Sequence, residues 1–173
     1  MVFETAFNFV IAKEGGYVDD PYDKGGATKY GISSRFIKAN DLKIKDVKEL
    51  TLLQAKEIYH IFFWNPLKID SFNDSTVQLF LFDTAINCGN EKASLLLQSS
   101  INSISHIAVD GKIGNETIST CNNITSNDSN NKLLKRLMLS NRIAYYVHIV
   151  ESNETQRRFL KGWVNRAVDV FKP

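Results

Sequence analysis

Residues 13–33 constrain this chain more than any other segment, because their composition excludes a long helix. They read KEGGYVDDPYDKGGATKYGIS and hold five glycines, three aspartates, three tyrosines and one glutamate. Glycine and proline at this density interrupt helical hydrogen bonding, so we predict a short, irregular β-hairpin or sheet here. A glutamate at a helix end, followed by an acid-rich turn, is typical of the edge of a cleft.

The preceding residues predict where Glu14 lies. Phe3, Phe7 and Val10 recur with Glu14 at the spacing of one helical face, so the apolar stripe of a first helix continues onto the glutamate. Burial and the negative end of the helix dipole both disfavour a charged carboxylate, which suits a general acid. On periodicity alone, a half-exposed glutamate without a catalytic role is an equally good interpretation.

A second carboxylate is expected from the turn. Glycosidic bond hydrolysis commonly pairs a protonated acid with an ionised carboxylate across the sugar ring. Asp23 precedes a Gly-Gly pair and is the best candidate, with the Thr28 hydroxyl placed to hold a water. Asp19 and Asp20 are more simply explained as turn formers.

The rest of the chain predicts a mainly helical protein of the α+β class, with one small β element. Ser33 or Ser34 caps the helix after the glycine-rich turn, and residues 122–131 (NNITSNDSNN) predict a polar loop. Helices are expected over residues 34–40, 51–64, 75–87, 91–101, 132–150 and 155–171, with a short one from Asn115 or Glu116.

Composition argues against several classes of function. The net charge is only +2, so nucleic-acid binding is a distant alternative, and the basic residues near 132–142 fit a solvated helix face. The three histidines have no metal-ligand spacing, and no cofactor is implied. Cys88 and Cys121 are predicted to be free buried thiols rather than a disulfide. No apolar run is long enough to cross a membrane, and the N-terminus does not read as a signal peptide.

The segment EGGYVDDPYDKGGATKYGIS resembles the signature of the glycoside hydrolase family 108 muramidases, departing from the usual pattern at Lys24 and Ser33. These enzymes include phage endolysins and secretion-associated muramidases, among them the one used for typhoid toxin export. The similarity continues through LTLLQAKEIYHIFFWNPL. Further on, FLFDTAINCGNEKASLLLQSSIN and VDGKIGNETI resemble the predicted peptidoglycan-binding module that accompanies the family. Phage lysozymes of the T4 type share the spacing from Glu14 to Asp23, whereas Thr28 lies one residue closer.

The resemblance implies a lysozyme-like fold, with a catalytic region at 1–85 and a helical peptidoglycan-binding-like region at 86–173 packed as one compact unit with it. It implies a monomer that cleaves the β-1,4 bond between N-acetylmuramic acid and N-acetylglucosamine, with Glu14 as general acid and Asp23 and Thr28 positioning water. Tyr30 is the best sugar-contact candidate. Trp64 and Asn87 are weaker ones, and core packing explains Trp64 equally well.

Two alternatives remain open from the sequence: a lytic transglycosylase, which needs one acid and no hydrolytic water, and a non-catalytic wall-binding export factor. The resemblance does not decide between host lysis and toxin release, or between retention and inversion. Inversion is favoured by analogy. We expect synthesis in the bacterial cytoplasm and action at the cell wall in the periplasm.

Overall fold

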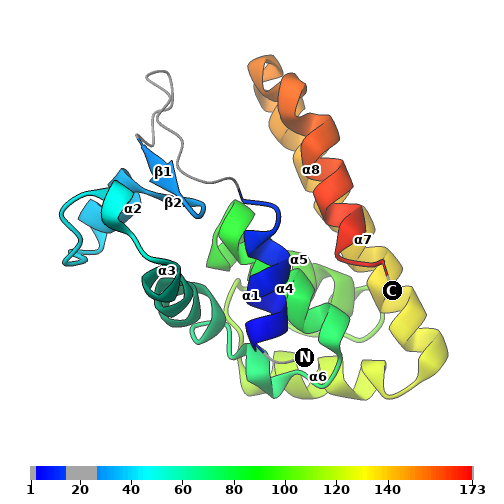
Figure 1. The fold of residues 1–173 in the computed structure, drawn as a ribbon. Helices are drawn as coiled ribbons and strands as arrows, with labels where there is room; N and C mark the ends of the chain where they lie inside the picture. The colour runs from blue at the N-terminus through cyan, green and yellow to red at the C-terminus, as the bar shows by residue number, and fades with distance from the viewer. Residues whose placement is uncertain (1–2, 15–26, 173) are drawn as a thin grey trace. The chain divides into compact units, whose positions relative to one another are not determined.

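The computed structural model describes residues 3–14 and 27–172, and it divides into two compact units, residues 2–64 and 65–173 (Figure 1). The described part is mainly helical, with one two-stranded antiparallel sheet, which confirms the predicted class. None of the described helices is both long and apolar enough to cross a membrane.

The N-terminal unit holds the helices and strands around Glu14. Helix α1 (Phe3–Ile11) buries Phe7 and Val10, and α3 (Leu52–Tyr59) buries Ile58 and Tyr59. Between these helices the chain forms β1 (Thr28–Lys29), β2 (Ile32–Ser33), α2 (Ser34–Ala39) and the 3-10 turn Val47–Glu49.

Side-chain caps fix where two of these helices begin. The Ser33 hydroxyl accepts a hydrogen bond from the Phe36 N–H and starts α2, as predicted. Thr51 and Gln54 form a reciprocal capping box at the start of α3. After Tyr59 the backbone changes to one π-helical stretch, His60–Trp64, which ends in the buried Trp64.

The C-terminal unit is built around α4 (Ser75–Cys88), whose residues from Val77 to Ala85 are all buried. Helix α4 packs on α5 (Asn90–Asn102) and α7 (Asp128–Ser152). Helix α7 also packs on α6 (Asn115–Thr125) and α8 (Arg157–Asp169). The 3-10 turns Ile69–Ser71 and Glu154–Gln156 precede α4 and α8.

The predicted polar loop at 122–131 is wrong. Helix α6 runs to Thr125 and α7 begins at Asp128, so only a two-residue connection separates them. The Asn127 side chain accepts a hydrogen bond from the Asn130 N–H and caps α7. Polar residues of this kind favour helix ends, which composition alone does not distinguish from a loop.

Candidate active site

Glu14 follows α1 and is not part of it: the regular helix ends at Ile11, three residues earlier than the periodicity predicts. Its N–H donates to the carbonyl oxygens of Val10, at 3.1 Å, and Ile11, at 3.2 Å, so helical hydrogen bonding continues past the end of the regular helix. The residue is half-buried. Its carboxyl group is therefore held at a helix end but is not sealed from solvent.

The hairpin next to Glu14 closes through a two-residue turn. Thr28 pairs with Ser33, and Lys29 pairs with Ile32. Tyr30 and Gly31 between them both have left-handed backbone angles, with φ of 53° and 75°. This combination is typical of a type I′ turn, whose twist matches that of the two strands it joins.

Gly31 faces the Glu14 carboxyl group at very short range. A Cβ atom on residue 31 would lie 2.8 Å from Glu14 Oε2 and 2.9 Å from Glu14 Cδ. The same atom would lie 2.6 Å from the Tyr59 hydroxyl oxygen. The carboxyl group and the tyrosine hydroxyl therefore converge on the turn at a point where only glycine fits.

Tyr59 connects α3 to this turn. Its hydroxyl donates a hydrogen bond to the Tyr30 carbonyl oxygen at 2.8 Å, and its ring is 1% exposed. The ring packs edge-on against Phe7 of α1, with centroids 5.9 Å apart. Helices α1 and α3 and the hairpin therefore meet at Tyr59.

The structure brings some of the predicted site residues together and leaves others apart or outside the described residues. Glu14 and the Tyr30 turn come together, while Thr28 is half-buried as the first residue of β1. Asp23, like Asp19 and Asp20, lies outside the described residues. The catalytic roles of Glu14, Asp23 and Thr28 stay predictions.

The two weaker sugar-contact candidates lie in different surroundings. Trp64 is fully buried, and its ring meets Phe3 edge-on at 5.1 Å, which favours the core-packing interpretation. Asn87 is exposed in the C-terminal unit, and its amide donates to the Asp83 carbonyl oxygen at 2.6 Å. A sugar contact by Asn87 stays a prediction.

Sequence reasoning missed Gly31 and Tyr59. The Tyr-Gly pair between two short β segments was the available signal for a tight turn. For Tyr59 the signal was a hydroxyl-bearing ring on the apolar stripe of the helix that starts at Thr51. A buried tyrosine hydroxyl usually has a hydrogen-bond partner, but the sequence does not identify it.

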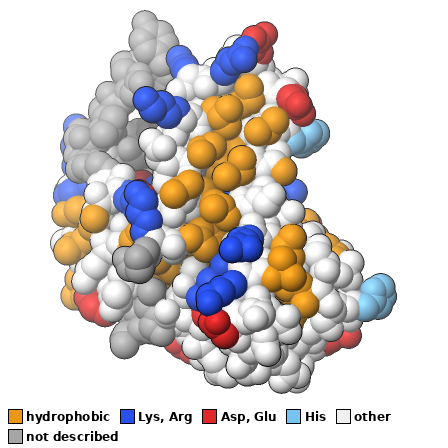
Figure 2. Space-filling view, turned by 90° about the vertical axis from the view of Figure 1, so that its right-hand side faces the viewer, with side chains coloured by type: hydrophobic (Ala, Val, Ile, Leu, Met, Phe, Trp, Pro, Cys, Tyr) orange, Lys and Arg blue, Asp and Glu red, His pale blue; other side chains and the backbone are white. Residues whose placement is uncertain are grey.

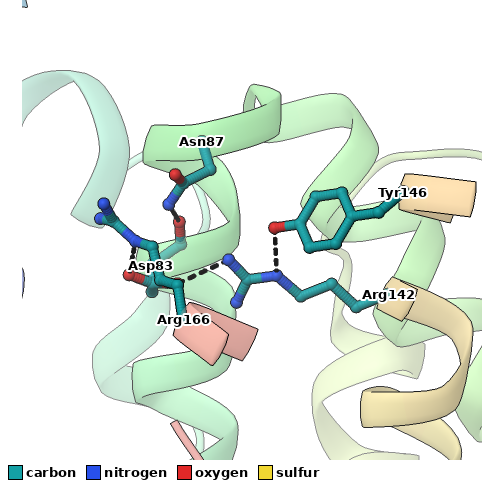
Figure 3. A network of polar contacts seen from close by, with 5 residues as sticks. All are labelled: Asp83, Asn87, Arg142, Tyr146 and Arg166. Carbon is teal, nitrogen blue, oxygen red and sulfur yellow. Dashed lines mark hydrogen bonds and ion pairs between the residues drawn. The ribbon is translucent and has the colours of Figure 1, made fainter. Parts of the chain in front are cut away.

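A second polar cluster lies inside the C-terminal unit (Figure 3). The fully buried Asp83 of α4 accepts from Arg142 Nη2 at 2.6 Å and from Arg166 Nε at 2.8 Å. Arg142 Nε in turn donates to the Tyr146 hydroxyl at 2.7 Å. The cluster joins α4, α7 and α8, and each of these contacts satisfies a buried polar group.

Burial and nearby charges shift the pKa values of groups in this cluster and of the two thiols. Burial opposes the charged form of Arg142, but the Asp83 carboxylate outweighs that effect and raises the pKa of the guanidinium. Burial also raises the pKa of Tyr146 and of Cys88. The pKa of Cys121 is raised to about 12, again by burial. Both thiols are free, as predicted, but only Cys121 is fully buried, since Cys88 is half-buried. The raised pKa values keep both protonated near neutral pH.

No described group of three or more histidine, cysteine or acidic residues is arranged to hold a metal ion.

Residues 7–89 match the family model described as Glycosyl hydrolase 108. The chain carries a glycosyl hydrolase 108 domain. Residues 92–168 of this glycosyl hydrolase match a second model, described as Predicted Peptidoglycan domain. The two models together cover most of the chain, and they confirm the predicted family and the predicted enzyme class. A glycosyl hydrolase domain beside a peptidoglycan domain implies hydrolysis of peptidoglycan.

The glycosyl hydrolase is also similar to a solved structure described as Brucella abortus SagA. The two chains are 29% identical, with a TM-score of 0.78, over 97% of this chain and 90% of the other. No curated protein sequence matches the chain.

The family models and the packing divide this glycosyl hydrolase at different places. The models meet between residues 89 and 92, close to the end of α4, whereas the compact units divide after Trp64. The boundary expected at residue 85 lies inside α4. The described candidate residues all lie within the range matched by the hydrolase model: Glu14, Thr28, Tyr30, Trp64 and Asn87.

Proposed function

We propose that this glycosyl hydrolase is an N-acetylmuramidase that cleaves the β-1,4 bond between N-acetylmuramic acid and N-acetylglucosamine, with Glu14 as the general acid. The observation that carries the proposal is the half-buried Glu14 carboxyl group, held at the end of α1 against the Gly31 turn inside the hydrolase domain. A general acid must be held within hydrogen-bond reach of the leaving oxygen, and a helix end braced by a turn provides a fixed position.

In the proposed reaction the protonated Glu14 carboxyl group donates its proton to the glycosidic oxygen as the bond to the anomeric carbon breaks. The sugar passes through an oxocarbenium-like transition state. Asp23, with Thr28, positions a water that attacks the anomeric carbon and loses its proton to the carboxylate. Inversion would need the two carboxyl groups about 6.5–9.5 Å apart, and retention about 5–5.5 Å.

We further propose that the enzyme acts on the cell wall in the periplasm, as a monomer, in host lysis or in the release of a protein toxin. The peptidoglycan domain supports the wall as the site of action. The resemblance to phage endolysins and secretion-associated muramidases supports both biological roles equally.

The Glu14→Gln variant tests the catalytic assignment. Glutamine keeps the size of the side chain but does not supply the proton, so we expect the rate of peptidoglycan clearance to fall by at least about 100-fold. The matched control is Glu49→Gln, an exposed glutamate of the same unit, which we expect to clear peptidoglycan at the parent rate. A Glu14→Gln variant as active as the parent would exclude the assignment.

Mass spectrometry of the digest distinguishes the reaction types. A muramidase releases fragments with a reducing N-acetylmuramic acid end, whereas a lytic transglycosylase releases 1,6-anhydro ends. Anhydro products would replace the proposed hydrolysis with the transglycosylase reaction. Binding without any released fragment would support a non-catalytic wall-binding factor.

A further inference from the structure

The backbone of Tyr30 is unusual for its residue type. Its φ of 53° lies in the left-handed region, which glycine, asparagine and aspartate enter far more readily than a bulky aromatic residue. A type I′ turn needs this conformation at both central positions, and tyrosine is not a residue that turn formation alone would select. Such conformations persist only where the surrounding structure holds them, and they cluster at functional sites.

Among the described residues, Tyr59 is hydrogen-bonded to the backbone of Tyr30. Its hydroxyl donates to the Tyr30 carbonyl oxygen at 2.8 Å, from a ring that is almost completely buried. The ring lies between Phe7 of α1 and Phe63, with centroid distances of 5.9 Å and 5.6 Å. A ring packed in this way has little freedom, so the hydroxyl provides a fixed anchor for the turn.

Gly31 is the residue of the turn that lies against the Glu14 carboxyl group. Because a Cβ on residue 31 would come within 3.0 Å of the glutamate carboxyl group, that group lies directly against the Gly31 backbone. Any side chain at this position would displace the carboxyl group or the Tyr59 hydroxyl. The glycine is therefore required by its φ of 75° and, independently, by this close approach.

We propose that Tyr59 and Gly31 are positioning residues for the Glu14 carboxyl group. Tyr59 fixes the turn by its hydrogen bond to the Tyr30 carbonyl oxygen. Because Gly31 has no side chain, the Glu14 carboxyl group lies directly against the turn, which limits the positions it can take. Neither residue takes part in proton transfer. Both act through Glu14, so the inference rests on the proposed function of that residue.

The Gly31→Ala variant tests the contact with the carboxyl group. We expect kcat on soluble peptidoglycan fragments to fall by roughly 10- to 100-fold, because small displacements of a catalytic group have effects of this size. KM should change less than about threefold, because the remaining sugar contacts are kept.

The matched control is Gly89→Ala in the C-terminal unit. Gly89 also has a positive φ, of 87°, which other residues rarely adopt, but a Cβ there would meet no atom within 4 Å. We expect this variant to lose thermal stability at least as much as Gly31→Ala and to keep the parent kcat. If both variants lost kcat equally, the loss in Gly31→Ala would come from general destabilisation and not from its contact with Glu14. That result would overturn the proposal.

The Tyr59→Phe variant removes one hydroxyl group and leaves the packed ring in place. We expect kcat to fall by about tenfold, with KM little changed. Tyr146→Phe is its control, since it also removes one buried hydroxyl, from the Arg142 hydrogen bond, and should lower stability without lowering kcat. A parent-like kcat in Tyr59→Phe would exclude the role of the hydroxyl.

A double-mutant cycle separates this inference from the proposed function. If Gly31 acts through Glu14, the Glu14→Gln/Gly31→Ala double variant should be no slower than Glu14→Gln alone. A double variant that is at least tenfold slower than Glu14→Gln overturns the positioning role. If Glu14→Gln itself is fully active, the proposed function fails instead.

Discussion

At the scale of single residues, the candidate site combines one group whose position could be predicted with two that could not. Helical spacing predicts a position for Glu14 next to the end of α1, and its N–H does bond the Val10 and Ile11 carbonyl oxygens from the turn that follows the helix. The contacts of Gly31 and Tyr59 depend on how α3 folds against the hairpin. Spacing along the chain determines local conformation, but it does not specify which distant side chain meets a given carboxyl group.

The second carboxylate gives a prediction at the same scale. We expect Asp23→Asn to lower kcat by about 100-fold or more, because asparagine cannot accept a proton from the attacking water. Asp19→Asn is the matched control in the same segment and should stay within about threefold of the parent. The measurement is the initial rate of fragment release from purified peptidoglycan. The reverse order of the two effects would assign the base to Asp19.

At the scale of elements, caps explain both a correct and an incorrect prediction. Serine and threonine before the apolar helices α2 and α3 indicate their starts, and both helices begin there. Asparagine, serine and aspartate at 122–131 were interpreted as a loop, although the same residue types end α6 and cap α7. Polar composition alone does not separate two helix ends from a continuous loop.

The cap of α4 gives a prediction on pH dependence. Asp74 accepts hydrogen bonds from the Thr76 and Val77 N–H groups, and its other oxygen binds Asn131 and pairs with Lys135 at 2.9 Å. Burial raises the pKa of this carboxyl group, but the Lys135 and Asn131 contacts and the backbone hydrogen bond outweigh burial and hold the pKa below its ordinary value of 3.8. The charged form therefore stabilises the folded unit.

We expect Asp74→Asn to be less stable than the parent at pH 7 by about 1 kcal/mol, because asparagine keeps the cap and loses the ion pair. The contribution of a carboxylate with a lowered pKa is fully present above pH 3.8 and is lost as the pH falls through the folded-state value. The stability difference should therefore shrink below pH 4. Urea unfolding at pH 7 and pH 3 measures it, with the exposed Asp41→Asn as control. A difference independent of pH would contradict this account.

At the scale of the whole molecule, the predicted mainly helical class and the predicted family are confirmed, whereas the domain boundary at residue 85 stays a prediction. The expected boundary at 85 follows the motifs, which separate near the end of α4. The compact units instead divide after Trp64, because α4 is the buried centre of the C-terminal unit. The boundary between two sequence motifs shows which residues match each family model. It does not show which helices pack around the same core.

The exposed surface of the C-terminal unit is mixed in character. Figure 2 shows hydrophobic side chains among lysines and arginines on the face that carries α7 and α8. The exposed large hydrophobic residues of these two helices are Leu133, Val147 and Phe159. These helices therefore present exposed apolar side chains on a surface that also carries charged residues.

The buried cluster of Asp83, Arg142 and Arg166 gives a prediction for the C-terminal unit as a whole. Asp83→Asn should lower the free energy of unfolding by about 3–5 kcal/mol, because it leaves two arginines without their carboxylate partner. Denaturant unfolding measures the loss, with the exposed Asp128→Asn as control. A loss below about 1 kcal/mol would show that water or other groups replace the carboxylate.

The left-handed Tyr30 has a consequence for laboratory evolution of this enzyme. A screen that selects only for heat resistance should favour asparagine or glycine at position 30, since both residues relieve the backbone strain of the turn. Such variants would lose the aromatic ring of Tyr30, the best sugar-contact candidate. If Tyr30 contacts the sugar as predicted, such variants will have a lower kcat, so each round of the screen should measure kcat together with heat resistance.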